Sequence, residues 1–209
     1  MTASSSKPQN ATPHRPEIDG LRSIAVLAVV FYHFAVPGFS GGFVGVDVFF
    51  VISGFLIGGI LWRDQCADRR LSLARFYLRR IRRLAPAYFA MAAVSLVVAS
   101  FVLLPFEFRE FGKGLIAATV YLSNVLFYRQ AGYFDTASEE KIFLHTWSLS
   151  VEEQFYLFLP LAFLILGRSR LGLIWGLTVL AVASWVACIW LTPSHQTATF
   201  YLFPFRDRF

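Results

Sequence analysis

Long apolar runs, separated by charged or Gly/Pro-containing segments, dominate the hydropathy pattern of the chain. A run of about 17 to 22 apolar residues is long enough to cross about 30 Å of hydrocarbon as a helix. The pattern predicts a shorter apolar stretch at 114–128 and longer spans at 21–38, 43–62, 85–104, 145–166 and 172–191. We therefore expect an all-α, polytopic transmembrane helical bundle of about six spans.

The composition supports this prediction. Of the 209 residues, 56% are hydrophobic and 15% are charged, and the mean hydropathy is +0.57. A soluble core cannot bury that much apolar surface, so membrane lipid is the expected partner. Two cysteines, Cys66 and Cys188, are too few for a disulfide framework and lack the neighbours that a metal site needs, so we expect neither a metal nor redox chemistry.

Residues 1–17 are polar and lack apolar periodicity, so we expect a disordered cytoplasmic tail followed by a membrane domain over 18–209. The first apolar run has no small-residue cleavage pattern. A second apolar run follows directly, so the first span should remain uncleaved.

Charge is concentrated between Arg63 and Leu84, where eight arginines stand against two aspartates. An excess of arginine marks cytoplasmic loops, so we expect this segment to be a cytoplasmic loop. The N-terminus lies two crossings earlier and should also be cytoplasmic. The net charge of +6 then reflects topology and phosphate-bearing partners rather than nucleic acid.

The first two spans should form an antiparallel hairpin, because the turn-rich segment from Pro37 to Gly42 is short. Gly45, Ser53 and Gly54 in the second span are small enough to allow close helix contact.

The stretch at 114–128 is short and carries Ser123 and Asn124. These features favour a re-entrant or partial helix, with 129–146 outside the membrane.

Arg22 and His33 are candidates for chemistry on the first span. Their spacing of eleven residues returns them to within about 20° of one helix face, roughly 16 Å apart along the axis. Ionisable groups inside a span tend to face a bundle interior, and histidine titrates near neutral pH, so His33 could take a proton from a hydroxyl. A packing histidine with an anchoring arginine is the alternative. Asp47, in the second span, could orient His33 or face interfacial water.

Glu152 and Glu153 are a second candidate pair. Glu152 shares a helix face with His145 and Ser148, whereas Glu153 points about 100° away. Adjacent carboxylates in an apolar span are costly, so at least one should face a cavity and hold His33 or bind an acceptor sugar; otherwise both lie at a wet interface. Trp147, Phe155 and Tyr156 are expected in an interfacial aromatic belt.

Four features occur in order: the Arg22-to-His33 spacing, GGFVGVDVFFVISGFLI at 41–57, FYLRRIRRLAP at 76–86 and HTWSLSVEEQFYL at 145–157. Together they resemble the acyltransferase-3 family of polytopic bacterial membrane proteins. The resemblance implies that Arg22 is essential and that His33 is the catalytic residue. It also implies an arginine pattern that falls on Arg79, Arg80 and Arg83, whereas Leu78 departs from it and Arg82 is an additional charge.

The resemblance implies transfer of an acyl group, with acetyl favoured, from cytoplasmic acyl-CoA to a hydroxyl of a cell-envelope carbohydrate or lipid-linked acceptor. Arg79, Arg80 and Arg83 would then bind the phosphates of coenzyme A, because guanidinium groups bind phosphate oxygens bidentately. Enforcement of topology or contact with anionic lipid is the alternative role of these arginines.

Members of the family reside in the inner (plasma) membrane and carry more spans than the six expected here, so the chain should be the N-terminal portion of their membrane domain. It would be a truncated product, a fragment, or half of a split protein with a complementary C-terminal half. Two other functions remain open: a proton-coupled transporter with Asp47, His33 and Glu152 on the proton path, and an inactive remnant.

Overall fold

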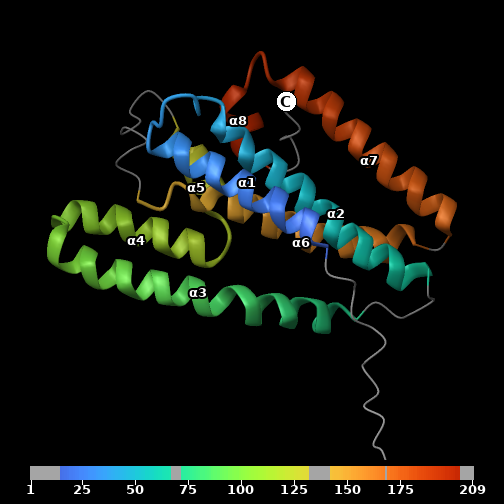
Figure 1. Cartoon of the computed structure of the whole chain (residues 1–209), viewed down its shortest axis with the longest axis horizontal. Coiled ribbons are helices and arrows are strands. Elements are labelled where there is room, and N and C mark those ends of the chain that lie inside the picture. Colours follow the sequence, from blue (N-terminus) through green and yellow to red (C-terminus); the bar gives the residue numbers. More distant parts are fainter. Residues whose placement is uncertain (1–14, 67–71, 132–141, 168, 203–209) are drawn as a thin grey trace, which may run out of the picture. The chain divides into compact units, whose positions relative to one another are not determined.

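The computed structural model describes residues 15–66, 72–131, 142–167 and 169–202 (Figure 1). Within these residues the chain is helical and contains no strand, which confirms the all-α prediction. The elements are α1 (Pro16–His33), the 3-10 helix η1 (Gly42–Val44), α2 (Gly45–Cys66), α3 (Leu73–Val102), α4 (Pro105–Thr119), α5 (Ser123–Gln130), α6 (Thr146–Leu166), α7 (Arg170–Leu191) and α8 (Gln196–Tyr201).

Four helical segments in the described part of the chain are long and apolar enough to cross a membrane: Gly42–Cys66, Leu73–Val102, Thr146–Leu166 and Arg170–Leu191. Helix α1 has 18 residues but includes Glu17, Asp19 and Arg22, so it is less apolar than these four. It begins at Pro16, within the range expected as a tail, because proline is well suited to the first turn of a helix. The rest of the expected tail, 1–14, lies outside the described residues.

The chain divides into two compact units, Met1–Ile57 and Gly58–Phe209, here called unit 1 and unit 2. Unit 1 is a helical hairpin, as predicted. The two arms are antiparallel, because residues later in α1 contact residues earlier in the second arm, which consists of η1 and the start of α2. The pairs are Arg15 with Phe55, Arg22 with Phe49, Ala25 with Gly45, Ala28 with Gly42, and Tyr32 with Phe43.

Glycine is required where the two arms of unit 1 approach most closely. A Cβ atom at Gly42 would collide with the carbonyl oxygen of Ala28, and one at Gly45 with the carbonyl oxygen of Ala25. In the connecting turn, Gly38 has a φ of +90°, which an L side chain rarely adopts. These glycines therefore fix the packing of the helix that carries His33.

Unit 2 begins with the end of α2 and the 30-residue helix α3. The segment from Arg63 to Leu84 was expected to be a loop. In the structure Arg63 lies within α2, and α3 already starts at Leu73. The expectation of a loop is therefore wrong for residues 73–84, because leucine, alanine and arginine are good helix formers. The Ser72 side chain caps α3 by accepting a hydrogen bond from the Arg75 backbone N–H at 3.4 Å. Arg69 and Arg70 lie outside the described residues.

The stretch at 114–128 is not one continuous helix. It is divided between α4 and α5 by a break at Val120–Leu122, where Tyr121 has a φ of +54°. Helix α4 packs on α3 through the Tyr88 hydroxyl, which donates to the Leu115 carbonyl oxygen at 3.3 Å. The expectation of a partial helix is met by two short helices in place of a span.

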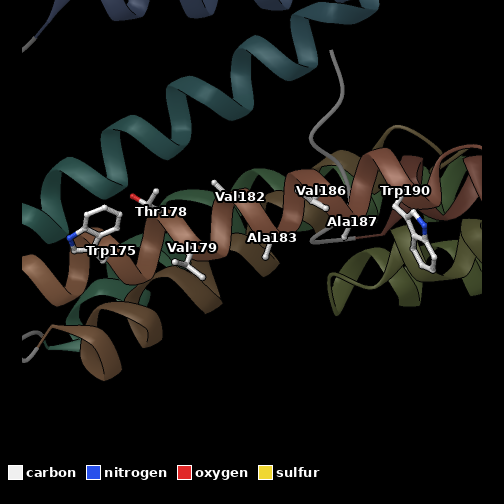
Figure 2. A pocket seen from close by; sticks show the side chains of 8 residues that line it. All are labelled: Trp175, Thr178, Val179, Val182, Ala183, Val186, Ala187 and Trp190. Atoms are coloured by element: carbon white, nitrogen blue, oxygen red, sulfur yellow. The ribbon is translucent and has the colours of Figure 1, made fainter.

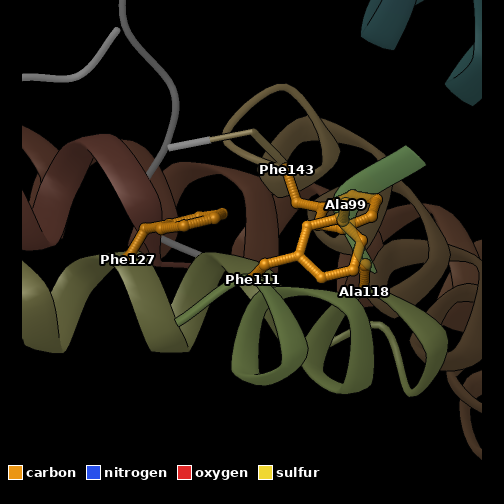
Figure 3. Packing of buried hydrophobic residues seen from close by; sticks show 5 residues of the cluster. All are labelled: Ala99, Phe111, Ala118, Phe127 and Phe143. Carbon is orange, nitrogen blue, oxygen red and sulfur yellow. The ribbon is translucent and has the colours of Figure 1, made fainter. Parts of the chain in front are cut away.

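An aromatic cluster holds the α3, α4, α5 and α6 region together (Figure 3). The rings of Phe111 and Phe143 lie 5.1 Å apart, and Ala99 and Ala118 fill the space beside them. Phe127 of α5 completes this cluster. Burial of these side chains fixes the start of α6 and hence the register of its polar residues.

One end of unit 2 gathers the ends of several helices. The Gln65 side-chain amide donates to the Gly167 carbonyl oxygen at 2.5 Å, and Arg170 donates to the Cys66 carbonyl oxygen at 3.3 Å. The end of α2, the end of α6 and the start of α7 therefore lie together. The Tyr77 hydroxyl, near the start of α3, contacts the Leu157 carbonyl oxygen in the second half of α6.

Candidate functional site

His33 ends α1 in unit 1 with its side chain exposed. Its Nδ1 lies 2.9 Å from the Val29 carbonyl oxygen. A carbonyl oxygen can only accept a hydrogen bond, so Nδ1 carries the proton and Nε2 keeps a lone pair in the neutral ring. The backbone of α1 thus selects the tautomer in which Nε2 can act as a base.

Arg22 lies on α1, eleven residues before His33, as the sequence predicted. Its guanidinium carbon lies 4.9 Å from the centre of the Phe49 ring, which is a cation–π contact across the hairpin. This contact joins the guanidinium group to the second arm of unit 1, and both residues are half-buried.

Asp47 lies half-buried in the first turn of α2. A carboxylate in the first turn is stabilised by the positive end of the helix dipole. Its role in orienting His33 remains a prediction, and the His33 ring donates its Nδ1 hydrogen bond to the Val29 carbonyl oxygen.

Arg80 and Glu153 form an ion pair between α3 and α6 in unit 2. The Nε atom of Arg80 lies 2.9 Å from Oε1 of Glu153, and their side chains are only 21% and 14% exposed. The guanidinium carbon also lies 3.1 Å from the centre of the Tyr156 ring. Arg80 is therefore fixed on one edge by a carboxylate and on one face by a phenol ring.

Tyr156 connects this ion pair to the second glutamate. Its hydroxyl donates a hydrogen bond to Glu152 four residues earlier on α6, and only 2% of the residue is exposed. The expectation of Tyr156 in an interfacial belt is wrong, because the ring is buried beneath Arg80. The sequence carries one signal for this contact: tyrosine follows the two glutamates at helical spacing.

The remaining arginines of the basic string project from α3 with exposed side chains. At about 100° per residue, Arg83 lies about 60° and Arg79 about 100° to one side of Arg80, whereas Arg82 lies about 160° away. Arg79, Arg80 and Arg83 therefore share one side of the helix. Arg82 lies farthest from Arg80 but only about 60° from Arg79, at the edge of that side.

A buried polar network joins α5 to α6 beside this cluster. Ser123 and Ser150 are fully buried and their hydroxyl oxygens lie 2.7 Å apart. Asn124 and Gln154 exchange two hydrogen bonds, and Gln154 also donates to the Tyr121 carbonyl oxygen at 3.0 Å. The sequence singled out Ser123 and Asn124 only as signs of a partial helix, and Gln154 was not predicted.

Tyr121 lies in the break between α4 and α5, outside the four candidate spans. Burial raises the pKa of its phenol above the ordinary value of 10.0, and the negative charge of Glu153 acts in the same direction. Its hydroxyl therefore stays protonated at physiological pH.

Two other features of the described residues bear on chemistry. Among them, no three His, Cys, Asp or Glu side chains are arranged to hold a metal ion. An open apolar recess of about 630 Å³ follows α7 between Trp175 and Trp190 (Figure 2), and no charged residue lines it. Tryptophans near both ends of an apolar helix are typical of a membrane-exposed face.

Comparison with known proteins identifies relatives along nearly all of the chain. It is 37% identical over 194 residues to the peptidoglycan O-acetyltransferase OatA of Listeria monocytogenes, covering 89% of this chain and 31% of that protein. It is also 37% identical to the Bacillus subtilis protein YrhL, provisionally named a peptidoglycan O-acetyltransferase, covering 89% of this chain and 30% of that protein. A Staphylococcus aureus protein provisionally named an O-acetyltransferase is 34% identical, covering 90% and 32%.

The chain thus spans about a third of the length of these relatives. No solved structure matches it. The family described as an acyltransferase domain matches residues 15–207, which include α1 with His33, the basic helix α3 and the glutamate-bearing helix α6. This membrane protein therefore belongs to the acyltransferase-3 family.

Proposed function

We propose that the protein transfers an acetyl group from acyl-CoA to a hydroxyl of a cell-envelope carbohydrate, with peptidoglycan as the first acceptor to test. The observation that carries this proposal is the 37% identity to a peptidoglycan O-acetyltransferase over 89% of the chain. The match includes both candidate groups, His33 on α1 and the arginines on α3.

The donor would bind through its phosphates to the side of α3 that carries Arg79, Arg80 and Arg83. Bidentate hydrogen bonds from guanidinium groups to phosphate are strong and directional. The end of unit 2 that gathers the ends of α2 and α6 also carries Arg63 and Arg170. The excess of positive charge supports a cytoplasmic location for this end, on the side where acyl-CoA is present.

His33 would act at the acceptor hydroxyl. Nε2 takes the hydroxyl proton while the hydroxyl oxygen attacks the thioester carbonyl. The ester forms, the carbon–sulfur bond breaks, and the thiolate of coenzyme A receives the proton back from His33. Transient acylation of Nε2 is a second route: Nε2 attacks the thioester, the carbon–sulfur bond breaks and the coenzyme A thiolate is released. The acceptor hydroxyl oxygen then takes the acyl group from Nε2, and its proton passes to the thiolate. Arg22 would contact the donor within the bundle.

Binding of acetyl-CoA to the detergent-solubilised chain tests the donor half of the proposal. Arg83→Gln removes a charge about 60° from Arg80 around α3, and Arg82→Gln removes an equal charge from the same helix about 160° from Arg80. We expect Arg83→Gln to weaken binding about tenfold, which corresponds to the loss of one charge-assisted contact, and Arg82→Gln to bind within about twofold of the wild type.

Absence of acetyl-CoA binding by the wild type would contradict the proposal. If the two variants lost acetyl-CoA affinity equally, the arginines would attract the donor by their overall positive charge and would not form a specific donor site. Proton flux in reconstituted vesicles without acetyl-CoA binding would favour the transporter alternative, and neither activity would favour an inactive remnant.

A further inference from the structure

The sequence predicts roles for Glu152 and Glu153 in acyl transfer, and the structure adds two contacts. Glu153 forms an ion pair with Arg80, and Glu152 accepts a hydrogen bond from Tyr156, whose ring covers Arg80. We infer that Glu153 and Tyr156 are positioning residues that hold Arg80 for the donor phosphates. The inference rests on the proposed function and adds residues of α6 to the donor site.

The ion pair of Arg80 with Glu153 involves only one of the three guanidinium nitrogens. The contact with Glu153 uses Nε at 2.9 Å. The phenol ring of Tyr156 covers one face of the guanidinium plane, 3.1 Å from its central carbon. The two terminal amino groups are outside the Nε–carboxylate bond, and together they offer the paired N–H donors that match two phosphate oxygens.

Tyr156 is itself held in place. Its hydroxyl donates to Glu152, and the residue is only 2% exposed. The Tyr77 hydroxyl donates to the Tyr156 carbonyl oxygen at 3.4 Å, so α3 and α6 are also joined beside the ring. Arg80 therefore lies on a rigid platform, and ordering it for a ligand costs less conformational entropy than ordering the exposed side chains of Arg79 and Arg83.

The ion pair also explains why a carboxylate stands next to a site for anions. An unpaired guanidinium inside an apolar bundle is costly, and Glu153 offsets that cost while no donor is bound. Only one edge of the guanidinium is occupied by the carboxylate. The pair is thus compatible with phosphate binding on the other edge.

Glu153→Gln tests the inference, because glutamine keeps the shape of the side chain and removes its charge. We expect the affinity of the solubilised chain for acetyl-CoA to fall about tenfold, the effect of misplacing one charge-assisted contact. In an acetyl-transfer assay the KM for acetyl-CoA should rise, and the KM for the acceptor should stay unchanged. Glu110→Gln is the matched control, because it removes an exposed carboxylate from an ion pair with Lys113 on α4. It should change neither the affinity for acetyl-CoA nor the KM for acetyl-CoA.

The exchanged pair Arg80→Glu with Glu153→Arg separates positioning from a structural role. It restores an ion pair between α3 and α6, so thermal stability should recover towards the wild type. Acetyl-CoA affinity should remain low, because the guanidinium then projects from α6. This variant remains informative if Glu153→Gln fails to fold.

Wild-type affinity in Glu153→Gln would overturn the inference, as would recovery of acetyl-CoA affinity in the exchanged pair. Either result could occur with a wild type that binds acetyl-CoA, so the proposed function would survive. Failure of the wild type to bind acetyl-CoA would instead overturn the proposed function.

Discussion

Asn124 and Gln154 bind each other through both ends of their amide groups, with Nδ2 to Oε1 at 3.2 Å and Nε2 to Oδ1 at 3.0 Å. Asn124 is 1% exposed and also donates to the Tyr201 carbonyl oxygen at 3.1 Å. The pair therefore joins α5, α6 and the end of α8. Since Glu153 directly precedes Gln154, the same contact sets the rotation of α6 that directs Glu153 towards Arg80.

Replacement of Asn124 by Leu should destabilise the protein by about 1 to 3 kcal/mol, because Gln154 would lose a partner in a buried site. Thermal unfolding of the solubilised protein measures the effect. The double variant Asn124→Leu with Gln154→Leu removes both polar groups and should recover part of the loss. A stability loss in the double variant larger than the sum of the losses in the two single variants would contradict this account.

Gly42→Ala should disturb the hairpin of unit 1, because the added Cβ would meet the Ala28 carbonyl oxygen. A cost of about 1 to 3 kcal/mol in thermal unfolding is expected for such overpacking. Gly41→Ala is the matched control, since nothing lies within 4 Å of the position of its Cβ. Similar melting temperatures in the two variants would show that the arms of the hairpin do not need this close approach.

The apolar runs were sufficient to predict that the chain is all-α, and the short length of 114–128, with Ser123 and Asn124, favoured a partial helix there. The break at Val120–Leu122 was not predicted. They did not predict that residues 73–84 are helical, because a hydropathy pattern does not distinguish a basic helix from a basic loop. That Arg79 and Arg83 lie on one side of α3 can be derived only when residues 73–84 are known to be helical.

Tertiary contacts account for most of the remaining differences. Tyr156 has the local pattern of a belt residue, and its burial depends on Arg80, 76 residues earlier in the chain. Gln154 resembles any polar residue near a helix start until Asn124 is placed opposite it. The tautomer of His33, in contrast, follows from a carbonyl oxygen four residues earlier on its own helix, and helical spacing alone could have suggested it.

Cys66 reports on topology, because it lies at the end of α2 beside Arg170 and its thiol is free. If this end faces the cytoplasm, a membrane-impermeant maleimide should label Cys66 in inverted vesicles and not in intact cells. Cys188, only 1% exposed, should stay unlabelled in both. Cys66→Ser is the control for specificity. Labelling in intact cells would place the arginines of α3 at the wrong membrane face for acyl-CoA.

Tyr121 should contribute to alkaline unfolding. Its folded-state pKa is raised above the ordinary 10.0, so the folded protein holds this proton more tightly than the unfolded chain does. The resulting stability is fully present below pH 10.0 and is lost as the pH rises through the folded-state pKa. Tyr121→Phe should therefore flatten the fall in melting temperature above that pH. An unchanged alkaline profile would show that burial does not act on this phenol.

His33→Asn separates the two nitrogens of the ring. The asparagine amide can still donate to the Val29 carbonyl oxygen in place of Nδ1, but nothing replaces the lone pair of Nε2. Acetyl transfer should fall by about 10² to 10⁴-fold, the usual contribution of a general base, with normal membrane insertion and acetyl-CoA binding. His33→Gln, which extends an amide towards the Nε2 position without a basic nitrogen, should be equally inactive. Acetyl transfer at the wild-type rate in either variant would show that His33 is not a catalytic residue.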